Sequence, residues 1–121
     1  MPAWEGLGVD RQEAAIGRRK ADSIELDPNP ATSHVSRTDQ DAFGKIFRRN
    51  IAYGSLTEHG TIFVGFCANQ PILAAMLDSM VGRGGPRDEL TRFTHPLTGA
   101  YYFVPSTAAL AAIAGDGTVS G

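Results

Sequence analysis

Two stretches decide the fold of this chain: Phe47-Arg48-Arg49-Asn50-Ile51-Ala52 and Thr61-Ile62-Phe63-Val64-Gly65-Phe66-Cys67. Both are rich in β-branched and aromatic residues, which favour strands. Residues 54–60, with a glycine at each end, are typical of a hairpin loop between them. The sequence therefore predicts two antiparallel strands, and the apolar composition of the second predicts that it is mostly buried.

A short helix and a long loop are predicted before this hairpin. Asp10, followed three residues later by Glu13, resembles a capping pair at the start of a helix. Gly17 follows the apolar residues of that helix, in the position where glycine often ends one. Residues 18–33 are polar and contain two prolines, so we expect an irregular loop there.

Helices and one more strand are predicted after the hairpin. Pro71 suits the first turn of an amphipathic helix, and Gly82 suits its end. Asp88 is placed to cap a short helix that reaches residue 93. Residues 101–104 are predicted as a strand, and an alanine-rich helix should start at residue 106 or 107. This order of elements favours the α+β class, with an antiparallel sheet covered by helices on one face.

Composition limits the function classes. The chain has 121 residues, which fits one domain, expected over residues 1–114 with a flexible tail at 115–121. Its net charge of −2 does not favour nucleic acid or an anionic membrane as a partner. The single cysteine, Cys67, excludes an internal disulfide and covalent CxxCH haem attachment, and it is expected as a small buried hydrophobe. We expect no membrane span and no targeting segment, and hence a cytoplasmic location.

Taken one at a time, the polar residues have ordinary interpretations. His59 and His95 are expected in exposed or turn positions, and His34 follows a proline-bearing loop. On a strand, Arg48 and Asn50 would point to one face and the residue between them to the other. The methionines of the helix after Pro71 are expected in the core.

The joint pattern is more specific, because motifs found in dye-decolorizing peroxidases occur here in the same order. These motifs cover the chain from about residue 13 to residue 110. They are Ile16-Gly17-Arg18-Arg19-Lys20, Ser33-His34-Val35-Ser36-Arg37-Thr38, Arg48-Arg49-Asn50-Ile51-Ala52-Tyr53-Gly54, Gly60-Thr61-Ile62-Phe63-Val64-Gly65-Phe66 and Leu97-Thr98-Gly99-Ala100-Tyr101-Tyr102-Phe103-Val104-Pro105-Ser106. The sequence thus resembles the C-terminal part of this family, and within it the compact bacterial branch.

The resemblance implies a haem b peroxidase built from two ferredoxin-like halves. This chain is similar to the C-terminal half, for which it implies a ferredoxin-like antiparallel sheet with helices on one face. In the family pattern, His34 matches the axial histidine of the haem iron, and Asp88 matches an acid near that histidine. Such an acid accepts the second imidazole N–H and makes the ligand more electron-rich.

The same resemblance implies residues for the opposite, distal face of the haem. Arg48 matches the distal arginine, and Asn50 matches a distal polar residue. A fixed positive charge suits the hydroxide that leaves when peroxide is cleaved. Arg18, or one of its basic neighbours Arg19 and Lys20, is expected to pair with the haem propionates.

One part of the family pattern is missing from this sequence. The distal aspartate of the family lies in a GxxDG motif, where it relays the proton of the peroxide. Gly115-Asp116-Gly117 ends like this motif, but Ile113 takes the place of its first glycine. Half of the implied distal machinery is therefore absent.

Two functions from different classes remain open at this point. The first is a haem peroxidase that uses hydrogen peroxide and a small-molecule organic reductant such as a dye. It would exist as a homo-oligomer, completed by a separate N-terminal half. The second is a non-catalytic haem-binding or structural α+β fragment. Some relatives are packed inside protein shells through a C-terminal extension. The tail at 115–121 is short and only loosely similar to such an extension.

Overall fold

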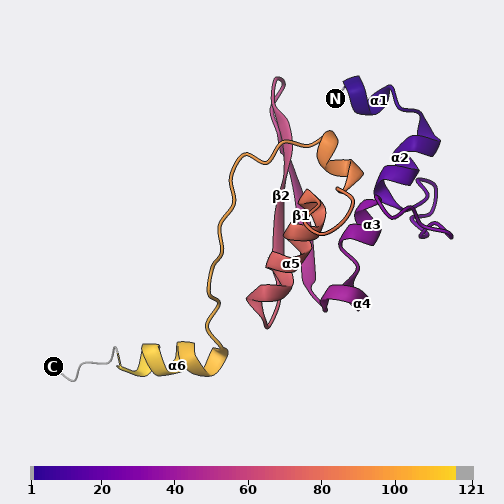
Figure 1. Ribbon diagram of the computed structural model, residues 1–121. Helices are drawn as coiled ribbons and strands as arrows, with labels where there is room; N and C mark the ends of the chain where they lie inside the picture. The colour runs from indigo at the N-terminus through magenta and orange to yellow at the C-terminus, as the bar shows by residue number, and fades with distance from the viewer. Residues whose placement is uncertain (1, 117–121) are drawn as a thin grey trace.

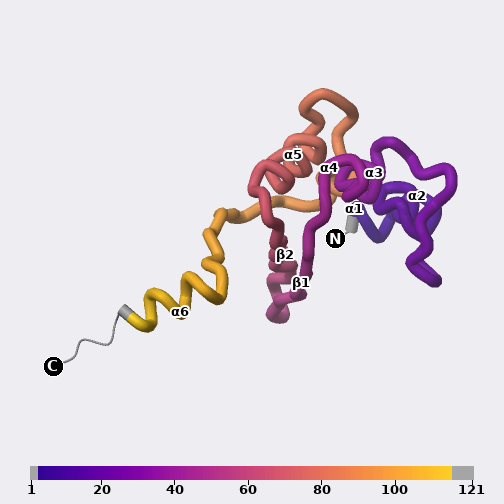
Figure 2. The backbone as a smooth tube through the Cα atoms, turned by 90° about the horizontal axis from the view of Figure 1, so that it is seen from below, coloured from indigo at the N-terminus to yellow at the C-terminus, as the bar shows by residue number. Residues whose placement is uncertain are grey.

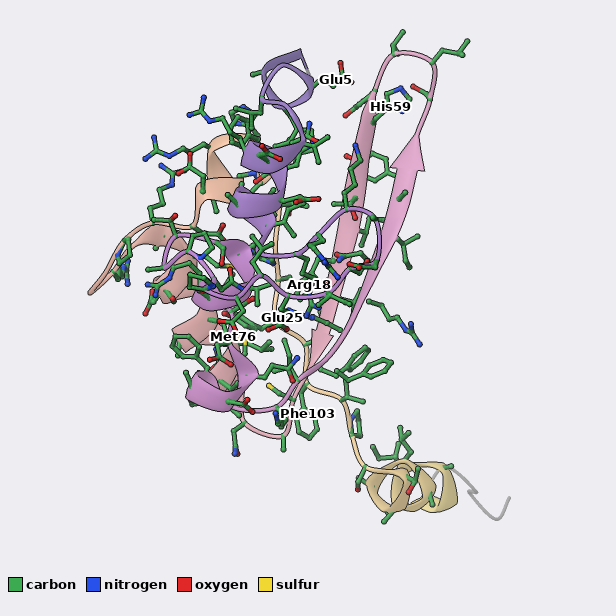
Figure 3. The ribbon with its side chains drawn as sticks, turned by 90° about the vertical axis from the view of Figure 1, so that its right-hand side faces the viewer. Glu5, Arg18, Glu25, His59, Met76 and Phe103 are labelled. Carbon is green, nitrogen blue, oxygen red and sulfur yellow. The ribbon has the colours of Figure 1, made fainter. Side chains whose placement is uncertain are left out.

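A two-stranded hairpin and a set of short helices make up the computed structural model, which describes residues 2–116 (Figure 1). Helices α1–α5 and the short 3₁₀ helix η1 lie to one side of the hairpin, whereas α6 stands apart (Figure 3). In chain order the elements are α1 (Pro2–Glu5), α2 (Val9–Ile16), α3 (His34–Arg37), α4 (Gln40–Phe43), β1 (Phe47–Gly54), β2 (His59–Phe66), α5 (Gln70–Val81), η1 (Glu89–Arg92) and α6 (Thr107–Asp116). The predicted α+β class is confirmed.

The hairpin is longer than the sequence predicted. β1 and β2 pair antiparallel from Phe47 opposite Phe66 to Gly54 opposite His59, so the turn shrinks to residues 55–58. The prediction that the second strand is mostly buried is wrong, because Phe63 is 53% exposed. Only one face of this sheet has helices against it, and an apolar strand needs cover on both faces to be buried.

Glycines end the two longer helices of the N-terminal and central parts, as predicted. Gly17 after α2 has φ +94° and Gly82 after α5 has φ +87°, in the left-handed region that favours glycine. The predicted capping role of Asp10 is wrong: Gly8 is the residue that precedes α2, and no side chain caps it. Asp10 instead lies in the first turn, where a carboxylate is favourable beside the positive end of the helix dipole.

The fully buried residues are few, and several of them are polar. Ala15 and Met76 are the buried apolar residues of the described chain, so the expected core position holds for this methionine. Ser33 and Asp88 are both 0% exposed. Because a buried polar group is costly unless it is hydrogen-bonded, these two positions mark a region in which the chain is built around specific polar contacts.

The segment between η1 and α6 is extended and unpaired (Figure 2). The predicted strand at residues 101–104 is wrong, since residues 94–106 have no regular secondary structure. Phe103 is 88% exposed. β1 and β2 hydrogen-bond only with each other in the described part of the chain, and a strand needs a neighbour to pair its backbone groups.

The C-terminal helix begins where the sequence predicted. The Ser106 Oγ accepts a hydrogen bond from the Ala109 N–H at 3.1 Å, and α6 then runs through Gly115 and Asp116. The predicted tail of residues 115–121 thus starts inside this helix, and residues 117–121 lie outside the described part. Within the described residues, every helix is too short or too polar to cross a bilayer.

Candidate functional site

The central contact of the site joins His34 and Asp88, which are 54 residues apart in the chain. The His34 Nδ1 lies 2.6 Å from Asp88 Oδ2. Asp88 is fully buried, whereas the His34 side chain is 29% exposed. Because an ionised carboxylate can only accept, an Nδ1–H is the form of the imidazole that fits this contact, and a neutral ring in that form has its lone pair on Nε2. Nε2 has no hydrogen-bond partner among residues 2–116.

The Asp88 carboxylate is held on both oxygens. Its second oxygen, Oδ1, accepts the Leu90 N–H at 2.9 Å, so the predicted helix-capping role is confirmed. The Asp88 N–H donates to the Met80 carbonyl at 3.0 Å, and the Thr91 hydroxyl donates to the Asp88 carbonyl at 2.7 Å. One side chain therefore caps η1 and orients the imidazole at the same time.

The backbone around His34 is tied to the backbone around Asp88. His34 is the first residue of α3, and the Thr38 hydroxyl donates to the His34 carbonyl at 2.8 Å. The Glu89 N–H donates to the Thr32 carbonyl at 2.8 Å. This bond links the residue two before His34 to the residue directly after Asp88, which fixes the two segments side by side.

Arg48 lies at a cavity of about 470 Å³ between α3, α4 and the start of β1. Val35, Ser36 and Thr38 of α3 line the same cavity. The Arg48 guanidinium is half-buried and makes no hydrogen bond or ion pair with any other residue of 2–116. Its donors are therefore available to a bound group.

Asn50 does not line this cavity, although it follows Arg48 on the same side of β1. It is exposed. Arg49 points to the other face, where its guanidinium lies 5.1 Å from the centre of the Phe47 ring. The alternation expected for a strand thus separates Arg48 from Arg49.

Arg18 lines the cavity as well, but its charge is compensated. Its Nη2 lies 2.7 Å from the Glu25 carboxylate, and its Nη1 donates to the Ser23 carbonyl at 2.9 Å (Figure 3). An anion would have to compete with Glu25 for this guanidinium. Of the two predicted arginines, Arg48 is the freer one.

A second charged pair lies at the rim of the cavity. The Lys45 ammonium donates to Asp41 at 2.6 Å, and both side chains are exposed. The hydrogen bond from Lys45 lowers the pKa of Asp41, and the same bond raises the pKa of Lys45. Lys45 is thus already paired with a carboxylate, which makes it a weaker competitor of Arg48 for an anion.

The remaining candidates lie away from His34. His59 is exposed at the start of β2 beside the hairpin turn (Figure 3). His95 is exposed in the extended segment after η1. Cys67 is half-buried with its thiol directed at the Asn69 carbonyl, so its predicted full burial is wrong. In the described chain, three or more histidine, cysteine or acidic side chains do not gather anywhere to form a metal site. The arrangement around His34 therefore suits a metal that needs one protein ligand, the His34 imidazole.

Comparison with known proteins places this arrangement in a family. The family model for the C-terminal part of Dyp-type peroxidases matches residues 1–109. A dye-decolorizing peroxidase of Mycobacterium tuberculosis is 39% identical over 116 residues, covering 88% of this chain and 35% of the relative. One from Brevibacterium linens is 38% identical, covering 88% and 32%. The chain thus spans about a third of the length of these relatives.

Solved structures agree with the sequence comparison. A dye-decolorizing protein from V. cholerae superposes with a TM-score of 0.81 at 44% identity, covering 90% of this chain and 38% of that one. A dye-decolorizing peroxidase from Bacteroides thetaiotaomicron gives a TM-score of 0.71 at 32% identity, covering 76% and 32%. The predicted ferredoxin-like class is the fold of these neighbours.

Proposed function

The chain belongs to the Dyp-type peroxidase family, in which it matches the C-terminal domain, and we propose that it provides the haem-holding part of a peroxidase. The complete enzyme would oxidise organic reductants such as dyes with hydrogen peroxide. The observation that carries the proposal is the 2.6 Å contact between His34 Nδ1 and the buried Asp88 carboxylate. It is the arrangement in which an imidazole becomes an electron-rich metal ligand through its other nitrogen.

The residues around His34 fit haem b. The imidazole has an Nε2 without a hydrogen-bond partner among residues 2–116, which is what binding to the iron requires. The cavity of about 470 Å³ is lined by the neighbouring α3 residues Val35, Ser36 and Thr38 and by Arg48, but not by His34 itself. Its volume falls in the range of about 300–1,000 Å³ typical of small-molecule sites. His34 would be the axial ligand. When bound, haem b supplies the redox-active iron at which peroxide is cleaved.

The chain's own residues have distinct tasks in this proposal. Asp88 holds the Nδ1 proton of His34 and so increases the electron density on Nε2. Arg48 carries a permanent charge and unused donors, which suit the stabilisation of a departing hydroxide. Asn50, next on that face of β1, would supply a further amide contact. Arg18 would share its guanidinium between a propionate and Glu25.

The GxxDG motif that carries the proton relay in the family does not occur in this sequence. α6, which contains Asp116, stands apart from the helices that surround His34 (Figure 1). We infer that a separate N-terminal half with the GxxDG motif would complete the enzyme. The alternative, a non-catalytic haem-binding or structural module, is favoured by this same gap. The test is dye oxidation with peroxide by the hemin-loaded chain together with that half. Oxidation of the dye would support the peroxidase, and no oxidation would support the non-catalytic module.

Asp88→Asn is expected to raise the reduction potential of the haem iron and to weaken hemin binding by about 10- to 100-fold. Asparagine keeps an oxygen for the Leu90 N–H and is a good capping residue, but it removes the negative charge beside Nδ1. Spectroelectrochemical and hemin titrations measure both effects. Asp78→Asn removes an equal charge from an exposed pair with Arg83 and should change neither. An unchanged potential and an unchanged hemin affinity in Asp88→Asn would leave Asp88 with its role as a helix cap alone.

Arg48→Ala is expected to lower dye turnover of the hemin-loaded, completed enzyme by about 100-fold, because a lost charge at the departing oxygen costs roughly 10²- to 10³-fold. Arg49→Ala is the matched control, since Arg49 is the next residue of the same strand and stacks on Phe47 on the other face. Steady-state assays compare the two variants. Equal losses in both, or none in Arg48→Ala, would remove Arg48 from the mechanism.

A further inference from the structure

A half-buried cluster of hydrogen bonds, centred on the buried Ser33, holds the chain directly before His34. Ser33 is 0% exposed, and its Oγ accepts the Ser36 N–H at 3.2 Å as the cap of α3. The same hydroxyl donates to the Asn29 side-chain oxygen at 2.7 Å and lies 3.0 Å from the Ser36 hydroxyl. Ser33 is thus bonded both to the helix that starts with His34 and to the loop before it.

Asn29 extends this cluster to the end of α2. Its side-chain nitrogen donates to the Gly17 carbonyl at 3.1 Å. Gly17 is packed so closely that an added Cβ would lie 2.7 Å from Asn29 Oδ1, 2.8 Å from Ser33 Oγ and 2.9 Å from the Val35 Cβ. The C-terminal end of α2, the loop and the start of α3 therefore meet with no room for a further atom.

The position of His34 depends on this cluster for a physical reason. α3 has only four residues, and so short a helix is not stable without outside support. His34 is its first residue, so the cap on Ser33 sets the direction in which the imidazole leaves the backbone. On the other side, the Glu89 N–H bond to Thr32 ties the same stretch to Asp88. Removal of Ser33 Oγ would take the acceptor from the Ser36 N–H and the donor from the Asn29 side-chain oxygen, in a half-buried place.

We propose that Ser33 and Asn29 are positioning residues that hold the His34 imidazole against Asp88 and aim Nε2 at the haem iron. The inference rests on the proposed function for its haem-related part. Neither residue touches the iron; both act through the backbone of α3. The sequence contains a signal for Ser33, because serine three residues before a helical N–H is a common cap, but none for Asn29, which contacts Gly17 across the loop.

The experiment compares Ser33→Ala with Ser106→Ala, which removes a serine cap of the same i to i+3 type from α6. Two quantities are measured: hemin affinity by absorbance titration, and the exchange rate of the His34 Nδ1–H by NMR in the chain without hemin. Ser33→Ala should weaken hemin binding by about 10-fold, at the lower end of what supporting groups of a metal ligand contribute, and should accelerate the exchange. Ser106→Ala should change neither.

Asn29→Ala keeps the test decisive if Ser33→Ala does not fold, because it leaves the Ser33 bond to the Ser36 N–H in place. It should shift both quantities in the same direction by a smaller factor. Wild-type affinity and exchange in a folded Ser33→Ala or Asn29→Ala variant would overturn the inference and leave a helix cap only. If instead hemin binding to the unaltered chain does not depend on His34, the proposed function fails, and the exchange rates still decide whether the cluster orients the imidazole.

Discussion

Hemin added to the chain is expected to give a histidine-ligated absorption spectrum, and His34→Ala is expected to abolish it. His34 is the residue whose Nδ1–H is held by a buried carboxylate and whose Nε2 has no partner among residues 2–116. Alanine removes the only nitrogen placed to bind the iron there, and it leaves Asp88 buried without its donor. The measurement is the visible spectrum, together with a hemin titration of the variant.

The other histidines provide the controls. His59 and His95 are exposed and lie outside the contacts of α3 and η1, so His59→Ala and His95→Ala should keep the wild-type spectrum. If one of them loses the spectrum while His34→Ala retains it, the assignment of the axial ligand is wrong. Adding imidazole to His34→Ala is a further check, because a small external ligand can replace a missing side chain when the site is otherwise intact.

The lone chain is expected to be a weak peroxidase, slower by about 10²- to 10⁴-fold than the same chain supplied with an N-terminal half that carries GxxDG. Arg48 supplies the charge that the reaction needs, but the GxxDG motif of the family's distal aspartate does not occur in this sequence. Asp39 is an acid at the cavity without an ion pair in the described chain, but it does not lie in that motif. Steady-state oxidation of a dye with peroxide, with and without the added half, measures the difference. Equal turnover in both samples would show that the chain needs no proton relay from outside.

The surface of the chain gives a second readout for the same experiment. Ile62 and Phe63 of β2 are about half exposed, and Tyr102 and Phe103 of the extended segment are almost fully exposed. Exposed apolar side chains of this size favour association between molecules. Light scattering should therefore show oligomers of the lone chain that become smaller when the added half covers this surface.

Local signals allowed a large part of the fold to be predicted. Gly17 and Gly82 end their helices because the left-handed backbone conformation has little steric cost for glycine alone. That rule is local and needs no knowledge of the rest of the chain. The cap by Asp88 is local in the same way. The pairing of β1 with β2 follows from two strand-like stretches with a short connection.

Features that depend on distant neighbours could not be predicted. Whether Phe63 is buried, or whether residues 101–104 join a sheet, is decided by what lies beside them, and no local pattern contains that information. The pairing of His34 with Asp88 was expected from the family resemblance alone, because a separation of 54 residues leaves no periodic signal. The contact of Asn29 with Gly17 had no signal of any kind.

The contact between His34 and Asp88 has a consequence for the order of events during folding. It closes a loop that contains α4, the hairpin and α5, and contacts between residues so far apart form late because the chain must first lose the entropy of loop closure. The imidazole is oriented only when that loop has closed. A cofactor that binds the closed form and not the open chain pulls the equilibrium toward the native state. Haem binding would thus stabilise the molecules in which this loop has closed over those in which it is still open.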